Sequence, residues 1–192
     1  MRNMPAERPA NVELRPPAAA DAAAGIAAAR ASRRLHGSWV QAPDTPARFG
    51  IYLERYGDWS RDAAQVGLLA CRRGDGALVG VINLSGIARG PFQSAYLGYY
   101  AFAPLAGTGL MALAFARALD HAFGKLRLHR VEANVQPGNR RSIALVTRAG
   151  FVLEGRSRRY LRIAGRWRDH LRFALLAEDW KARGRRERSR RR

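Results

Sequence analysis

The sequence predicts a single mixed α/β (α+β) domain, in which a mostly antiparallel sheet contains one central β-α-β crossover. The chain has 192 residues, 47% of them hydrophobic, which suits one domain with a substantial core. Most strand-like segments follow one another as hairpins, and a helix separates two strands only in the middle of the chain. Residues 11–180 contain no internal repeat and no linker, so they are expected to fold as one unit.

The first third of the chain predicts one short strand and two helices. Residues 11–15 alternate in polarity as a strand does. Asp21 belongs to the residue types that cap helices, and an Ala-rich stretch follows it until Gly37 stops the helix. Thr45 and Pro46 form a second helix start, with Thr as the cap and Pro at the first helical position.

Three strands and a helix are predicted next. Residues 65–71 and 77–84 are rich in aliphatic side chains and flank a glycine-containing turn, so they are expected to form a hairpin. Residues 95–102 form the third strand of this group. Apolar side chains at helical spacing over residues 110–123 then predict a helix.

The last third of the chain is expected to contain a strand, a helix and a hairpin. Residues 129–136 are strand-like, Asn139 can cap the helix that follows, and Gly150 can end it. Residues 151–163 and 167–177 read as two long strands around a short turn, which predicts the final hairpin.

The sequence favours neither secretion nor a membrane location. Cys71 is the only cysteine, so no internal disulfide can form, and the N-terminus lacks the apolar core of a signal peptide. Residues 91–116 carry no charge and are long enough to cross a bilayer, but glycines and a proline divide them into a strand, a turn and a helix start. We therefore expect a cytoplasmic protein without a membrane span, and no metal site is indicated.

The formal net charge of +19 is concentrated partly at the C-terminus. Residues 181–192 hold eight basic residues and one acidic residue, a density that is typical of a disordered arm. Residues 1–10 are likewise expected to form a flexible leader. The tail is interpreted either as a solvated arm or as a contact with RNA or the ribosome.

The segment with the most chemical information is a strand, a glycine turn and a helix in succession. Gly107, Thr108 and Gly109 follow the strand, and glycines let a backbone approach a ligand closely. The first amides of the helix are unpaired and suit an anion such as a pyrophosphate. A Walker A motif is absent. A dinucleotide fingerprint fits these glycines with Ala112 and Glu132, but the motif lies behind an antiparallel hairpin, which argues against it.

Three segments resemble the GNAT superfamily of N-acetyltransferases, specifically the ribosomal-protein alanine acetyltransferases of the RimJ/RimL kind. They are residues 77–102, the GTGLM sequence of residues 107–111, and residues 131–180, which include VEANVQPGNRRSIALVTRAGF. The resemblance implies a GNAT fold in which the strands predicted at 95–102 and 129–136 splay apart. Acetyl-CoA would then be the co-substrate, with its pantetheine arm between these two strands.

The resemblance also implies the cofactor contacts. Backbone groups around Phe102 would bind the pantetheine arm. The amides that would hold the pyrophosphate are those of Gly107, Thr108, Gly109, Leu110 and Met111. Members of the family usually carry Arg or Gln where this chain has Ala106. Because the remaining donors are main-chain amides, cofactor binding is expected to survive this difference.

The catalytic residues follow less directly from the resemblance. Related enzymes use a strand Glu and a helix Tyr, and the matching positions hold Asn134 and Val146, which cannot do acid–base chemistry. Asn134 is kept as a candidate catalytic-site residue, because it stands at the position of the strand Glu in those enzymes. The Asn-x-x-Ser pattern of Asn139 and Ser142 is similar to the RimL type, in which the serine would protonate the departing thiolate and the asparagine would bind the pantetheine or the helix start. Helix capping alone would also explain this pair.

The acceptor is expected to be the α-amine of a protein N-terminus, with a ribosomal protein as the family-level inference. An α-amine has a pKa near 8, so it needs no strong base, and Glu132 and His170 are interpreted as an ion-pair partner and a packed core residue. Tyr160 is expected to border the acceptor groove. Two alternatives stay open: a small amine such as an aminoglycoside or polyamine, and a catalytically weak module that binds RNA or the ribosome. A monomer or a homodimer is expected.

Overall fold

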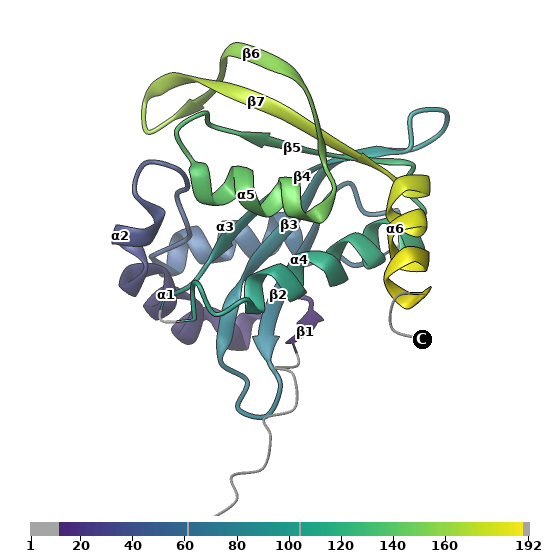
Figure 1. Cartoon of the computed structure of the whole chain (residues 1–192). Helices are drawn as coiled ribbons and strands as arrows, with labels where there is room; N and C mark the ends of the chain where they lie inside the picture. The colour runs from purple at the N-terminus through teal and green to yellow at the C-terminus, as the bar shows by residue number, and fades with distance from the viewer. Residues whose placement is uncertain (1–11, 61, 104, 190–192) are drawn as a thin grey trace, which may run out of the picture.

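One mixed sheet organises the computed structural model, which describes residues 12–60, 62–103 and 105–189 (Figure 1). The strand order is β1-β2-β3-β4-β5-β7-β6, and all neighbours are antiparallel except β4 and β5, which are parallel. The strands are β1 (Val12–Arg15), β2 (Val66–Arg72), β3 (Leu78–Ala88), β4 (Ser94–Ala101), β5 (Arg130–Val135), β6 (Val152–Ile163) and β7 (Arg166–Leu176). The predicted α/β class and its single central crossover are therefore confirmed.

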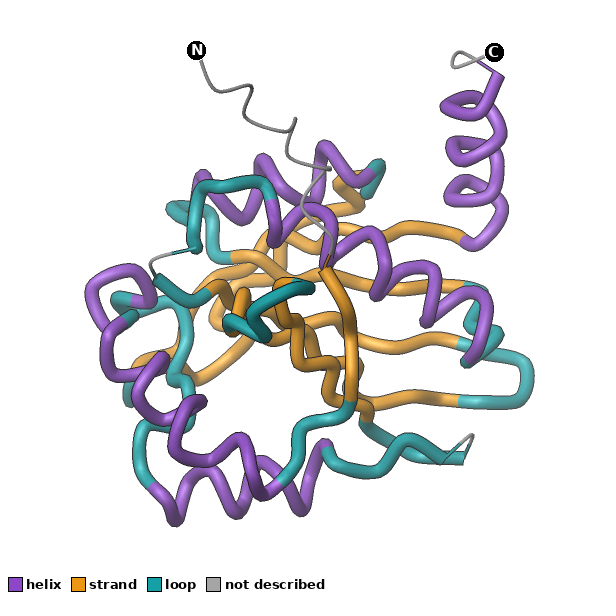
Figure 2. The backbone as a smooth tube through the Cα atoms, turned by 90° about the horizontal axis from the view of Figure 1, so that it is seen from below, coloured by secondary structure: helices purple, strands orange, loops and turns teal. Residues whose placement is uncertain are grey.

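Helices cover both faces of the sheet (Figure 2). The described helices are α1 (Ala22–Ala31), α2 (Arg33–His36), α3 (Pro46–Tyr56), α4 (Leu110–Asp120), α5 (Arg140–Ala149) and α6 (Ala177–Ser189), with short turns η1 (Ala19–Asp21) and η2 (His121–Lys125). Ile26 of α1 and Phe49 of α3 pack with Val81 of β3 in one core cluster. Phe115 of α4 and Val146 of α5 belong to the larger cluster on the other face. The sheet therefore separates an α1–α3 side from an α4–α5 side.

The Ala-rich segment differs in detail from the single capped helix that the sequence predicts. Ser32 interrupts it, because the hydroxyl donates to the Ala28 carbonyl at 2.7 Å and accepts from the Ala103 amide at 2.9 Å. Such side-chain bonds compete with the helix ladder. Gly37 ends the second piece, α2, as predicted. Asp21 makes no side-chain cap bond to α1, because its carboxylate binds Arg15 and the Ala18 amide on the N-terminal side instead.

The basic tail is the clearest correction to the sequence analysis. Residues 181–189 are not a disordered arm but the greater part of helix α6. Glu178 and Asp179 lie in the first turn of this helix, where negative charge is stabilised by the helix dipole. Trp180 also donates to the Asp120 carboxylate at 2.8 Å, which ties the start of α6 to the end of α4. The leader, residues 1–10, lies outside the described residues.

The uncharged stretch from residue 91 to 116 is divided as predicted. It supplies β4, the glycine turn and the first half of α4. In the part of the chain that the structure describes, no helix has the length and apolar character that a membrane span requires.

Asp21 joins the first strand to the helical layer and gives a test of the fold. Its carboxylate accepts from Arg15 at 2.5 and 2.7 Å and from the Ala18 amide at 2.8 Å, and the bond from Arg15 lowers the pKa of Asp21 below its usual value. A lowered folded-state pKa stabilises the fold above the ordinary carboxyl pKa, and this contribution is lost as the pH falls through the folded value.

We expect Asp21→Asn to lower the free energy of unfolding by about 1 kcal/mol at neutral pH. The difference from the parent protein should shrink as the pH falls through the lowered pKa of Asp21, because the parent carboxyl then becomes protonated as well. Urea unfolding of both proteins at neutral and acidic pH measures this. An equal difference at both pH values would show that the carboxylate charge is not what stabilises the contact.

Candidate active site

The central feature of the site is the point where β4 and β5 part. The two strands pair only at Ser94↔Arg130, Ala95↔Val131 and Tyr96↔Glu132, although β4 continues to Ala101 and β5 to Val135. Parallel strands that stop pairing leave unsatisfied main-chain groups along both edges. The predicted splay is therefore present, with an opening between the last halves of β4 and β5.

The alternation of the backbone decides which groups face this opening. The Phe102 amide donates to the Val79 carbonyl of β3 at 2.8 Å, and the Gln93 carbonyl accepts from the His129 amide on the β5 side at 2.8 Å. Because main-chain groups alternate sides along a strand, the odd-numbered Tyr99 and Ala101 turn theirs toward the opening. Phe102 itself is 3% exposed in the α1–α3 cluster, so the main-chain groups of its neighbours, and not its own amide, face the opening.

One of the two main-chain groups of Ala101, its carbonyl, already has a hydrogen-bond partner. His36 Nε2 donates to the Ala101 carbonyl oxygen at 2.9 Å, and the imidazole is 6% exposed between Tyr100 and Phe102. The Ala101 N–H remains directed into the opening by the strand alternation. A donor in this place is suited to an oxyanion that develops on a thioester carbonyl.

The glycine turn forms an open cradle at the start of α4. Gly107 and Gly109 both have φ of 85°, and a Cβ built on either would meet nothing within 4 Å. Gly109 is the N-cap of α4, and the amides of Leu110 and Met111 in the first turn have no acceptor inside the helix. Thr108 closes the turn by donating to the Leu105 carbonyl at 2.7 Å. The turn therefore combines left-handed glycines, free space and helix-start donors, which suits an anionic ligand.

A second helix start lies beside the same opening. The Asn139 side chain accepts from the Ser142 amide at 3.1 Å and caps α5, so the capping role of Asn139 is real. The Ser142 hydroxyl lies 2.5 Å from the Tyr99 hydroxyl of β4. This bond connects the N-terminal turn of α5 to the strand edge at which β4 and β5 part.

Tyr99 is a buried phenol whose hydroxyl can either donate to or accept from the Ser142 hydroxyl, and which also lies 3.4 Å from the Ser142 carbonyl oxygen. Its ring packs edge-on against Phe115 of α4, with the ring centroids 4.9 Å apart. Burial raises the pKa of Tyr99 to about 12, although the bond to Ser142 acts in the opposite direction. The phenol therefore stays protonated throughout the neutral range. When Tyr99 donates to the Ser142 oxygen, the serine proton is free to point elsewhere.

Asn134 lies on the other edge of the opening and is partly unsatisfied. Its Oδ1 atom is buried and has no hydrogen-bond partner among the residues that the structure describes. Odd-numbered residues of β5 such as Val131 and Ala133 are buried in the α4–α5 cluster, so the Asn134 side chain points to the α1–α3 side. An amide oxygen cannot act as a base, but it can accept a hydrogen bond from an amine.

Tyr160 lies on the α1–α3 side of the outer hairpin, together with a buried histidine. Its ring contacts the His170 ring, with the ring centroids 5.7 Å apart. The pKa of Tyr160 is raised, mainly by burial and to a smaller extent by a hydrogen bond with Tyr96. His170 is 2% exposed, its Nδ1 lies 3.0 Å from the Arg168 carbonyl, and burial lowers its pKa. His170 is thus the packed core residue that the sequence predicts.

Two carboxylates on or near the α1–α3 side, those of Glu132 and Asp44, form ion pairs with arginines. Glu132 accepts from Arg130 Nε at 2.9 Å, which confirms its interpretation as an ion-pair partner. Asp44 of the α2–α3 connection binds Arg33 at 2.9 Å and Arg48 at 3.0 Å. No group of three or more His, Cys, Asp or Glu side chains with metal-binding geometry occurs within residues 12–60, 62–103 and 105–189.

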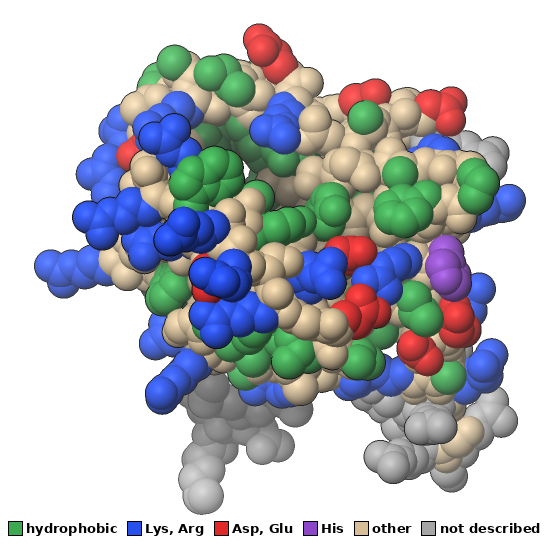
Figure 3. Space-filling model, turned by 90° about the horizontal axis from the view of Figure 1, so that it is seen from above, with side chains coloured by type: hydrophobic (Ala, Val, Ile, Leu, Met, Phe, Trp, Pro, Cys, Tyr) green, Lys and Arg blue, Asp and Glu red, His purple; other side chains and the backbone are tan. Residues whose placement is uncertain are grey.

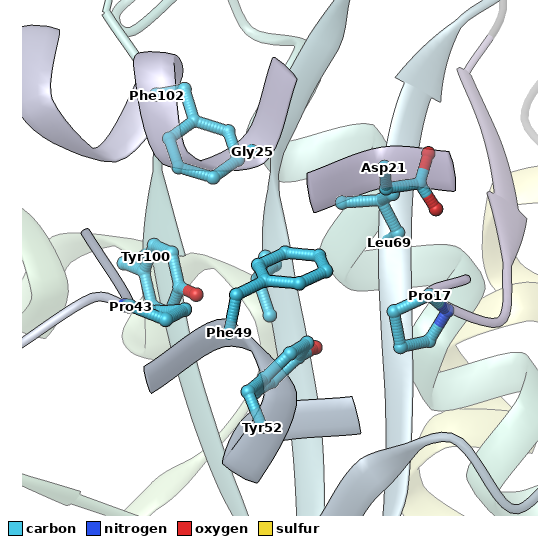
Figure 4. A pocket seen from close by; sticks show the side chains of 10 residues that line it. Pro17, Asp21, Gly25, Pro43, Phe49, Tyr52, Leu69, Tyr100 and Phe102 are labelled. Carbon is cyan, nitrogen blue, oxygen red and sulfur yellow. The ribbon is translucent and has the colours of Figure 1, made fainter. Parts of the chain in front are cut away.

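Two hollows on the α1–α3 side differ in character. A small cavity of about 10 Å³ lies among Phe49 and Tyr52 of α3, Tyr100 of β4, and Phe102, which follows β4 (Figure 4). This is the space of about one water molecule. It is a packing defect rather than a substrate site. A larger, open groove of about 190 Å³ lies beside α2, with His36 in its lining.

These features define the class of protein. Parted parallel strands and an anion cradle at a helix start are the parts that an acyl-CoA-dependent transferase needs, and residues 11–152 match the sequence profile of the acetyltransferase (GNAT) domain. The chain therefore belongs to the GNAT acetyltransferase family.

Within this family, the proteins similar to this chain include RimJ-like acetyltransferases. The chain is 42% identical over 103 residues to [Ribosomal protein uS5]-alanine N-acetyltransferase of Escherichia coli, covering 54% of this chain and 53% of that protein. It thus spans about half the length of this curated relative. The structure of Mycobacterium smegmatis RimJ in complex with CoA-disulfide superposes with a TM-score of 0.79 and 31% identity, covering 87% of this chain and 82% of that one.

A polyamine acetyltransferase has the same fold at greater sequence distance. Spermidine N-acetyltransferase from Vibrio cholerae, in complex with CoA and spermine, superposes with a TM-score of 0.74 at 22% identity, covering 88% of this chain and 97% of that one. At this identity the likeness establishes the fold alone.

Two residues of the site were missed by the sequence analysis. Tyr99 is one of three tyrosines in AYLGYYAF, and period-2 alternation could have separated it from Tyr100. Its bond to Ser142 joins residues far apart in sequence, which no local pattern reveals. His36 was not considered because it stands in an Ala- and Arg-rich helix without a motif.

Proposed function

We propose that this chain transfers the acetyl group of acetyl-CoA to the α-amine of a protein N-terminus, with a ribosomal protein as the acceptor. Two observations carry the proposal: the end of β4–β5 pairing after Tyr96 and Glu132, and the left-handed glycines Gly107 and Gly109 in the turn that leads from β4 to α4. The pantetheine arm would lie in this opening, and the pyrophosphate would bind the amides from Gly107 to Met111. The proposal keeps the cytoplasmic location expected from the sequence.

The proton balance of the reaction assigns a role to Ser142. A neutral amine attacks the thioester carbonyl, the carbon–sulfur bond breaks, and the nitrogen loses one proton while the thiolate gains one. Ser142 would give its proton to the thiolate, and its 2.5 Å contact with Tyr99 supplies a donor that stabilises the serine oxygen as it does so. Asn134 Oδ1, which has no hydrogen-bond partner within the described part of the chain, would accept from the attacking amine and orient it. Water would then carry the amine proton to the Ser142 oxygen, which restores the serine hydroxyl.

The charges around the site favour an N-terminal amine over a polycation. Glu132 and Asp44 are each neutralised by arginines, so neither offers a free carboxylate to a polyamine or aminoglycoside. An α-amine with a pKa near 8 is partly neutral at neutral pH, whereas an amine near 10 would need a stronger base. The name of the Escherichia coli relative supports an N-terminal alanine as the acceptor.

An acceptor comparison tests the proposal. We expect acetyl-CoA-dependent thiol release with a peptide that begins with alanine to exceed release with spermidine by about 100-fold in kcat/KM. The control is the same peptide with its α-amine blocked and a lysine retained, which should be inactive. The kcat/KM for the free peptide should rise with pH and level off near pH 8, as the α-amine becomes neutral. Faster turnover of spermidine or of the blocked peptide would refute the assignment of the acceptor.

A further inference from the structure

Positive charge gathers at the turn end of the β6–β7 hairpin. Residues 156–168, which we call the basic arm, contain six arginines and no acidic residue. Arg156 forms a salt bridge with Asp169 at 2.6 Å. Arg158, Arg159 and Arg166 are exposed and form no salt bridge with any residue in the described part of the chain.

Large apolar side chains are exposed among these arginines. Trp167 is 61% exposed and Leu161 is 44% exposed, and Trp167 is directly opposite Arg162 in the register of the hairpin. Figure 3 views the molecule from the side of β6 and β7, and its left part, where Figure 1 places the hairpin turn, shows many basic side chains with apolar ones between them. Trp167 shares one face of the hairpin with Arg162, whereas Leu161 and Arg166 lie on the other face. The exposed tip therefore offers an aromatic ring with guanidinium groups on both faces of the hairpin, a combination that suits stacked bases and phosphates.

The charge argues against a second copy of the chain as the partner. A symmetric contact through the same patch would place the arginines of both copies against each other, which is unfavourable. The excess of arginines favours an anionic partner instead, and Trp167 adds a preference for unpaired bases, since bases inside a duplex do not expose their faces.

We infer that the basic arm binds a single-stranded segment of RNA, with phosphates on Arg158, Arg159 and Arg166 and one base stacked on Trp167. This inference relies on the proposed function only for the choice of RNA, because a ribosomal acceptor is presented next to RNA. The arm lies at the opposite end of β7 from α6 (Figure 1), so the binding surface is distinct from the basic tail that the sequence analysis considered.

The test measures binding of a fluorescent oligouridine by anisotropy over a range of salt concentrations, without acetyl-CoA. The triple variant Arg158→Gln, Arg159→Gln, Arg166→Gln should bind at least about tenfold more weakly, and its slope of log K against log salt should fall by about 2. Trp167→Ala should also weaken binding about tenfold but leave the salt slope unchanged, because stacking releases no counterions.

The control variant removes the same charge elsewhere: Arg34→Gln, Arg127→Gln, Arg148→Gln, all exposed positions. Equal weakening by this control would show that net charge alone causes binding and would overturn the inference. Loss of binding only on deletion of residues 181–192 would assign RNA binding to the tail instead and would also overturn it. So would equal affinity for duplex DNA or for anionic lipid vesicles. Because no acetyl transfer is measured, these outcomes are separate from failure of the proposed function.

Discussion

Gly109→Asp is expected to abolish binding of coenzyme A, with a loss of affinity of about 100-fold or more. Two effects act in the same direction at this position. The φ of 85° at Gly109 disfavours any side chain, and the new carboxylate would extend into the open space where the pyrophosphate would lie. The new carboxylate and the pyrophosphate would repel each other. The backbone of the turn is fixed, so the two negative charges could not move apart while the pyrophosphate stays bound to the turn amides. Isothermal titration calorimetry with coenzyme A measures the loss.

Gly90→Asp is a matched control for this experiment. Gly90 also has a positive φ, 65°, and a Cβ there would meet nothing within 4 Å, but it lies in the turn between β3 and β4, at the other end of β4. It adds the same charge and comparable strain, so it should leave coenzyme A affinity unchanged. If Gly109→Asp bound as tightly as this control, the turn at residues 107–109 would not be the pyrophosphate site.

The local signals of the chain predicted its elements well. The Thr45–Pro46 start of α3 and the Asn139 cap of α5 occur as expected, with side-chain bonds to the Arg48 and Ser142 amides. These signals act over three or four residues, so the sequence displays them directly. The splay of β4 and β5 depended instead on the resemblance to a family, since no local pattern determines where two strands stop pairing.

What the sequence could not predict depends on tertiary contacts. The basic tail has the composition of a disordered arm, but the contact between Trp180 and Asp120 anchors the start of a helix there. Backbone groups around Phe102 were expected to bind the pantetheine arm, and the register of β4 against β3 directs the main-chain groups of Tyr99 and Ala101, on its N-terminal side, toward the opening between β4 and β5. In each case a contact across the fold decides the outcome.

Ser142→Ala is expected to lower kcat by about 10- to 100-fold, at the lower end of general-acid effects, because a thiolate is already a good leaving group. The KM for acetyl-CoA should change little, since the cradle amides are untouched. Tyr99→Phe should lower kcat by about 3- to 10-fold through the loss of the donor to Ser142. Stopped-flow or continuous thiol detection at saturating acceptor gives both values, with Tyr56→Phe on α3 as the control for loss of a tyrosine hydroxyl.

The double variant Tyr99→Phe, Ser142→Ala shows whether Tyr99 acts only by positioning Ser142 or contacts the substrates directly. If Tyr99 acts only through the serine oxygen, the double variant should be no slower than Ser142→Ala alone, because removal of the serine already breaks the contact. The dependence of kcat on pH should show no ionisation of Tyr99, since its raised pKa of about 12 keeps the phenol protonated throughout the assay range. Additive losses would mean that Tyr99 contacts the substrates independently. An unchanged kcat in Ser142→Ala would remove the serine from the reaction and leave it as a residue of the α5 cap.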